Sequence, residues 1–149
     1  MLVTIMAANT RFAVGVHLLT ALAWSGGTLT SEDLAGSVLT NAVVLRRILS
    51  RLEKAGLVLG HPGRKGGFTL ARPASSITLL DVHRAVGGEG LFAVHANREA
   101  KHCPVSACIK GVLADVFTKA EGAAEGELRR VRLSDVVARV PAASGRRRA

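Results

Sequence analysis

Two groups of side chains have the types and spacing that recognition or redox chemistry requires. One group combines hydroxyl, amide, apolar and guanidinium groups that can match the base edges, thymine methyls and phosphates of duplex DNA. The other is the pair Cys103 and Cys108, which could carry thiol chemistry or bind a metal ion. The members of the first group are Thr40, Asn41, Val43, Arg46, Arg47 and Ser50.

The first group lies on one face of a predicted helix. Apolar residues recur at positions 45, 48, 49 and 52, the spacing of a helix with one buried face. The basic residues then occupy the opposite face, flanked by Arg46 and Arg51. Thr40 or Asn41 can cap this helix, and Gly56 follows its expected end at about Ala55. The alternative is an amphipathic helix whose basic face is only solvated.

Further helices are predicted on both sides of this one. Apolar periodicity indicates a helix over residues 11–24, and a capping box at residues 30–33 begins a short helix through Ser37. A second capping box, formed by Thr78 and Asp81, begins a helix that continues to Val86.

A basic hairpin follows the helix that carries the first group. Two β segments are predicted at residues 57–60 and 68–71, joined by a turn rich in Pro and Gly that bears Arg64 and Lys65. Two helices, an outward-facing basic helix and a basic hairpin in this order predict a winged helix-turn-helix. Arg64 and Lys65 are then expected to contact DNA from the wing. The alternative is an ordinary hairpin turn made soluble by its charge.

A long one-sided helix is predicted from Pro104 to about Val131, followed by a short terminal helix that Ser134 opens. Such a helix needs a partner surface, so we expect it to mediate dimerisation. We divide the chain into a winged helix-turn-helix over 1–90, a sensor loop over 91–103, helices over 104–140 and a disordered basic tail over 141–149. The predicted interface residues are Val105, Ile109, Val112, Val116, Ala120 and Ala123.

The thiol of Cys103 is expected at the start of this long helix, beside Lys101 and His102. A helix N-terminus and nearby cations favour the reactive thiolate, so Cys103 is a candidate sensor. A bond to Cys108 would require the first turn to unwind, because five helical residues rise about 7.5 Å. A disulfide between protomers is the other route. The alternatives are two cysteines that only fill space, or a metal site formed with His102.

The charge balance suits a polyanionic partner. Twenty Lys and Arg residues oppose eleven Asp and Glu, giving a formal charge of +9. The apolar run over residues 12–24 is too short to span a bilayer, which needs roughly twenty residues. Residues 1–6 show neither the basic region nor the cleavage site of a signal peptide. We therefore expect a cytoplasmic protein with no membrane partner.

Four segments of the chain resemble the Rrf2 family of bacterial winged-helix regulators, which includes an iron–sulfur cluster regulator and a nitric-oxide-sensing repressor. The resemblance covers residues 6 to about 140. It implies a mainly α-helical winged helix-turn-helix with a two-stranded wing and a long C-terminal dimerisation helix. It also implies phosphate contacts by Asn9, Thr10 and Arg11. The segments read NTRFAVGVHLL at 9–19, LRRILSRLEKAGLV at 45–58, GRKGGFTLAR at 63–72 and ITLLDVHRAV at 77–86.

The cysteine segment departs from the family pattern. Members that carry an iron–sulfur cluster use three cysteines in this loop, whereas this chain has only two in all. His95, His102 or a carboxylate of the other protomer would have to complete a ligand set. We therefore expect no cofactor.

The sequence thus predicts a sequence-specific DNA-binding transcription regulator, a repressor that binds a palindromic operator as a homodimer and responds to redox stress through Cys103 and Cys108. Three alternatives remain. One is a basic protein that binds nucleic acid without sequence choice, although the four Phe and one Trp form no visible stacking platform. Another is a thiol oxidoreductase, although C-x4-C is not the C-x2-C spacing of that class. The third is a regulator of this fold that has lost its sensing role.

Overall fold

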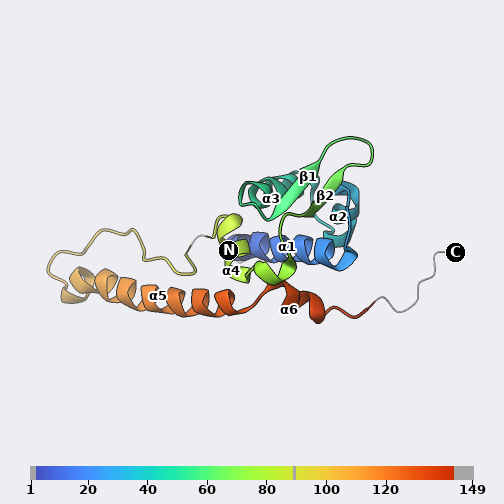
Figure 1. Cartoon of the computed structure of the whole chain (residues 1–149). Helices are drawn as coiled ribbons and strands as arrows, with labels where there is room; N and C mark the ends of the chain where they lie inside the picture. The colour runs from blue at the N-terminus through green and yellow to red at the C-terminus, as the bar shows by residue number, and fades with distance from the viewer. Residues whose placement is uncertain (1–2, 89, 143–149) are drawn as a thin grey trace.

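The computed structural model describes residues 3–88 and 90–142. A head of short elements surrounds the central helix α1, with α2, α3 and the wing on one side and α4 and α6 on the other, while α5 extends away (Figure 1). The elements are α1 (Val3–Ser25), α2 (Ser31–Val38), α3 (Ala42–Lys54), β1 (Val58–His61), β2 (Gly67–Leu70), the 3-10 turn η1 (Ala74–Ser76), α4 (Leu79–Ala85), α5 (Pro104–Arg130) and α6 (Leu133–Ala138).

The predicted helix caps are present. The amide of Asp33 donates to Thr30 Oγ1 at 3.1 Å, and the amide of Thr30 donates to Asp33 Oδ2 at 2.9 Å. This reciprocal pair satisfies two amides that the first turn of α2 would otherwise leave unpaired. Asn41 is the N-cap of α3, and its Oδ1 accepts from the amide of Val43 at 2.7 Å. The caps therefore set where both helices of the helix-turn-helix begin.

The core lies where α1 meets α3 and α4. Leu45, Ile48, Leu49 and Leu52 of α3 are buried, as their spacing predicted. At Gly15 of α1, a Cβ atom would lie 3.0 Å from Val86 Cγ1, so the missing side chain lets α1 approach α4 closely. The α1 residues in this core are Val14, Leu18, Leu19 and Leu22.

Helix α1 differs from its prediction in extent and in burial. It begins at Val3 rather than at residue 11. Phe12, Val16 and Ala23, expected on its main apolar stripe, are only half-buried, whereas Leu18 and Leu22 are fully buried. The reason is that α1 contacts elements on both of its sides, so its buried surface is wider than one stripe.

The wing is a two-stranded antiparallel sheet in which His61 pairs with Gly67 and Val58 with Leu70. Each strand is displaced by one residue from its prediction. A bridge joins β2 to the α1–α2 connection: Leu29 donates to the Phe68 carbonyl at 3.1 Å and accepts from its amide at 2.8 Å. A Cβ atom at Gly67 would lie 2.4 Å from the Leu29 carbonyl oxygen, so only glycine permits this approach.

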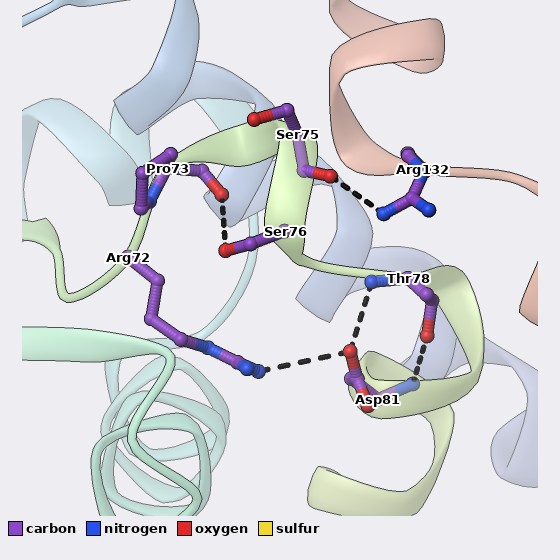
Figure 2. A network of polar contacts seen from close by, with 7 residues as sticks. All are labelled: Arg72, Pro73, Ser75, Ser76, Thr78, Asp81 and Arg132. Atoms are coloured by element: carbon purple, nitrogen blue, oxygen red, sulfur yellow. Dashed lines mark hydrogen bonds and ion pairs between the residues drawn. The ribbon is translucent and has the colours of Figure 1, made fainter.

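A polar network joins the segment that follows β2 to the N-terminal ends of α4 and α6 (Figure 2). Asp81 caps α4 through the amide of Thr78 at 2.9 Å and pairs with the Arg72 guanidinium at 3.6 Å. Arg132 Nη1 donates to the Ser75 carbonyl at 2.7 Å. The capping box predicted for α4 is thus confirmed. The Asp81 carboxylate also pairs with Arg72, which follows β2.

Helix α6 belongs to the core of the head. Its Leu133 is fully buried, and the Leu133 amide donates to the Ile77 carbonyl at 2.8 Å. The sequence division grouped α6 with the dimerisation helix, but the core includes α6 and leaves α5 outside. The physical reason is that the backbone after α5 pairs with the residues that precede α4, through Thr78 and Arg132.

Helix α5 contacts the head near its C-terminal end and projects beyond it, with the loop over residues 91–103 returning to its N-terminus (Figure 1). Arg84 pairs with Glu125 at 3.1 Å, and Phe92 stacks on Phe117 with ring centroids 5.2 Å apart. Among the described residues, no helix combines the length and apolar character that crossing a membrane requires. The tail predicted from residue 141 lies outside the described residues beyond residue 142.

Candidate nucleic-acid interface

The outward face of α3 carries the basic residues that the sequence singled out. Arg46, Arg47 and Ser50 are exposed, on the side of α3 away from its four buried residues. Within the described part of the chain, neither Arg46 nor Arg47 has a hydrogen-bond or ion-pair partner. Burial of one face of a regular helix directs these side chains to solvent, where a polyanion can reach them.

The N-terminal end of α3 carries the remaining members of the set. Val43 is 54% exposed, although it is apolar. The Asn41 side-chain oxygen is already used as the helix cap, so only its NH2 group remains to donate to DNA. Thr40 is half-buried in the turn between α2 and α3. This end can therefore offer one amide donor and an apolar contact side by side.

The wing presents its two cations at its tip. Arg64 and Lys65 are exposed in the loop that projects between β1 and β2 (Figure 1). Gly63 has a φ of 99°, and its carbonyl accepts from the Gly66 amide at 3.0 Å, which closes the turn. His61 Nε2 and Thr69 Oγ1 lie 2.8 Å apart across the strands. These contacts hold the turn, so the cations extend from a defined base.

The wing is tied to α3 by Glu53. Its Oε1 accepts a hydrogen bond from the Gly60 amide in β1 at 3.1 Å. A Cβ atom at Gly60 would lie 2.9 Å from the same oxygen, so glycine leaves room for this contact. The two predicted DNA-contacting elements are thus joined directly, a link that the sequence pattern did not indicate.

Arg51 has a different role from its neighbours on α3. Its Nη1 donates a hydrogen bond to the carbonyl oxygen of Val86, the C-cap of α4. That oxygen has no partner within α4, because the helix ends there. Sequence reasoning placed Arg51 beside the basic face, and no local signal could reveal a partner thirty-five positions away.

Thr10 and Arg11 are exposed on α1. Phe12, next along the chain, packs edge-on against the His83 ring of α4 with centroids 5.2 Å apart. This contact turns Phe12 toward α4, whereas Thr10 and Arg11 face other directions around α1. Their expected phosphate contacts stay a prediction.

The two cysteines occupy different environments. Cys103 is the N-cap of α5, directly before Pro104, as the sequence predicted, and its side chain makes no capping hydrogen bond. It is half-buried and lines an open pocket of about 540 Å³ together with Lys101 and His102. Cys108 is exposed on α5, and both thiols are free.

The predicted dimer stripe divides into two parts. Val105, Val112 and Val116 are 66%, 57% and 51% exposed, and Ala123 is exposed as well. Ile109 and Ala120 are half-buried. Because Phe92 of the preceding loop covers Phe117, one side of α5 is contacted within the chain and the valine side is left open.

The fold and its basic surfaces define a winged helix-turn-helix of the kind that regulates transcription. The family model Rrf2, described as an iron-dependent transcriptional regulator, matches residues 8–139. The chain therefore belongs to the Rrf2 family, whose members are transcriptional regulators and not enzymes, as the sequence predicted.

Known proteins agree with this assignment. YwnA of Bacillus subtilis, which is named as an HTH-type transcriptional regulator, is 41% identical over 130 residues, covering 87% of this chain and 96% of YwnA. A solved structure described as a DNA-binding protein is 35% identical, with a TM-score of 0.68 over 85% of this chain and 97% of that one. A transcriptional regulator from Lactobacillus plantarum is 28% identical, with a TM-score of 0.74 over 86% of this chain and 87% of that one.

The iron in the family description requires ligands, and the described residues of a single copy do not group into a set. The sequence has two cysteines, one at a helix cap and one exposed on the next turns of α5. Within the described ranges, no three Cys, His, Asp or Glu side chains are grouped so that they could hold a metal ion. The described donors of one copy therefore form no complete ligand set for iron.

Proposed function

We propose that this chain is a sequence-specific transcriptional repressor that binds a palindromic operator as a homodimer in the cytoplasm. The observation that carries the proposal is the outward face of α3, where Arg46, Arg47 and Ser50 are exposed and the two guanidinium groups have no partner among the described residues. Among the described residues, these two guanidinium groups therefore stabilise the head through no hydrogen bond or ion pair. Free guanidinium groups on a rigid helix instead suit guanine edges and phosphates.

The docking mode follows from the link between α3 and the wing. Helix α3 enters the major groove with its N-terminal end, where Asn41 donates from its NH2 group and Val43 contacts a thymine methyl. Arg64 and Lys65 then reach the backbone or the adjacent minor groove from the wing. The Glu53–Gly60 hydrogen bond holds the two elements in one orientation. The net charge of +9 attracts the protein to any duplex, and α3 selects the site.

Dimerisation is supported by the open valine side of α5. An apolar face that runs from Val105 to Val116 on a projecting helix is stabilised when a second copy covers it. Two copies related by a two-fold axis present two α3 helices, so their half-sites form a palindrome. The half-site centres then lie about 34 Å apart or a multiple of that distance.

Thiol sensing is part of the proposal. The half-buried Cys103 lies at the start of the helix proposed to dimerise and lines an open pocket, so a change at its sulfur acts on the dimer. Cys108 is either the resolving thiol, after the first turn unwinds, or the partner in a bond between protomers.

The proposal is tested by selecting binding sites from a library of random duplexes with the purified full chain. Enrichment of one palindrome, protected from cleavage in a footprint, and repression of transcription from a promoter that contains it are the expected results. Retention of all sequences alike would instead identify the protein as a non-specific nucleic-acid-binding protein. Arg47→Ala, which should lose the enriched site and keep the fold, is the matched control.

A further inference from the structure

Leu39, in the turn between α2 and α3, has an unusual backbone. Leu39 is the C-cap of α2, with φ 56° and ψ 45°, and its amide donates to the Ala35 carbonyl at 2.9 Å. This left-handed conformation closes many helices, but glycine or asparagine usually adopts it, because the Cβ atom of other residues meets the backbone there. A leucine at this position is strained.

Packing does not compensate for this strain. The Leu39 side chain is 87% exposed, more than any other large apolar side chain in the described part of the chain. Its contribution to the core of the head is therefore negligible, and a glycine would close α2 with less strain. A strained, exposed apolar residue that the fold does not need indicates a role outside folding.

The position of Leu39 indicates what that role is. It lies two residues before the N-cap Asn41 and four before Val43, which is itself 54% exposed. Leu39 thus lies in the turn that leads into the N-terminal end of α3, the end that a helix-turn-helix presents to the major groove, and Val43 lies in the first turn of that helix. The apolar feature of that groove is the C5-methyl group of thymine, which charged side chains cannot read.

We propose that Leu39 is a specificity-determining residue, whose side chain contacts thymine methyl groups in the operator beside those contacted by Val43. This inference rests on the proposed function, since it requires a preferred operator. The left-handed backbone of Leu39 then directs its side chain away from the head. The strain is tolerated because the contact improves the choice of sequence and not the stability of the fold.

The experiment uses the operator selected by the full-length wild type and compares Leu39→Gly, Leu39→Asn and Leu39→Met. The glycine and asparagine variants should melt at the same or a higher temperature and bind the operator about tenfold more weakly. Their affinity for random duplex should stay within about twofold, because phosphate contacts are unchanged. Leu39→Met should keep most of the operator affinity. Leu91→Ala, at an exposed leucine of the loop after α4, is the matched control and should change neither quantity.

Replacing thymidine by deoxyuridine in the operator removes the C5-methyl groups alone. The loss of affinity that this replacement causes in the wild type should be smaller in Leu39→Gly, because the partner side chain is already absent. Equal operator affinity in wild type and Leu39→Gly, or equal losses on operator and random duplex, would overturn the inference and leave the proposed function standing. A selection that enriches no sequence would overturn both.

Discussion

Arg51 of α3 and Val86 of α4 are joined by a hydrogen bond from the guanidinium Nη1 to the main-chain carbonyl oxygen. The bond is partly buried and satisfies a carbonyl that the end of α4 leaves without a helical partner. Helix α3 is therefore attached near its C-terminal end to α4, which packs on α1. Its exposed residues Arg46 and Arg47 remain available to bind DNA.

Replacing Arg51 by alanine should destabilise the fold. A hydrogen bond from a charged donor is lost and a partly buried carbonyl is left unpaired, so the free energy of unfolding should fall by about 1–2 kcal/mol. Urea unfolding measures the change. Arg46→Ala removes an exposed guanidinium that has no partner in the described part of the chain, and should stay within about 0.5 kcal/mol of wild type. Equal losses in the two variants would contradict the structural role of Arg51.

Replacing Arg47 by alanine should weaken operator binding without changing stability, the reverse of what we expect for Arg51→Ala. Operator binding should weaken by about 1–3 kcal/mol if the guanidinium reads a base, while the unfolding free energy is unchanged. Titration of the selected operator, with the melting temperature recorded beside it, separates the two effects. An Arg47→Ala protein that bound the operator as tightly as wild type would remove this residue from base recognition.

Replacing Arg64 by alanine should weaken binding to every sequence by a similar factor. The wing tip is expected to contact the backbone, so the slope of log affinity against log salt should also decrease in magnitude by about one. The measurement is a salt titration on operator and on random duplex. If affinity and salt dependence were both untouched, the assignment of the wing to DNA contact would be wrong.

Replacing Val112 by glutamate should disrupt the dimer. A charge in the centre of the open valine side of α5 would be buried without a partner when two copies associate, so the dissociation constant should rise by at least about tenfold. Sedimentation equilibrium measures it. Ala114→Glu changes an exposed residue on the other side of the same helix and should leave association unchanged. A monomeric wild type would refute the role of α5 directly.

Mild oxidation with hydrogen peroxide should change the DNA affinity of the wild type and leave that of Cys103→Ser unchanged. The peroxide takes two electrons and two protons from two thiols, which form a disulfide as two waters are released. Cys108→Ser distinguishes the partner, since without it any bond must join two copies of Cys103. Gel shifts before and after oxidation, with a thiol count, provide the measurement. Equal responses in wild type and Cys103→Ser would exclude Cys103 from the mechanism.

Local chemistry determined much of this protein from the sequence alone. The caps at Thr30, Asn41 and Thr78 act within three residues of themselves, so the starts of α2, α3 and α4 could be read directly. The apolar period of α3 likewise decided its buried face, and the glycines of the wing turn decided where the chain reverses. The family follows from these local patterns and their order.

The tertiary structure decided the features that depend on partners distant in sequence. Arg46 and Arg51 have the same chemistry and lie on the same helix. Among the described residues, Arg51 meets a carbonyl and Arg46 does not, because α4 ends beside Arg51. The grouping of α6 with the head, the bridge from Leu29 to the wing and the open valine side of α5 likewise depend on the folded chain. In each case the decisive contact joins segments that only the folded chain brings together, and no local pattern encodes it.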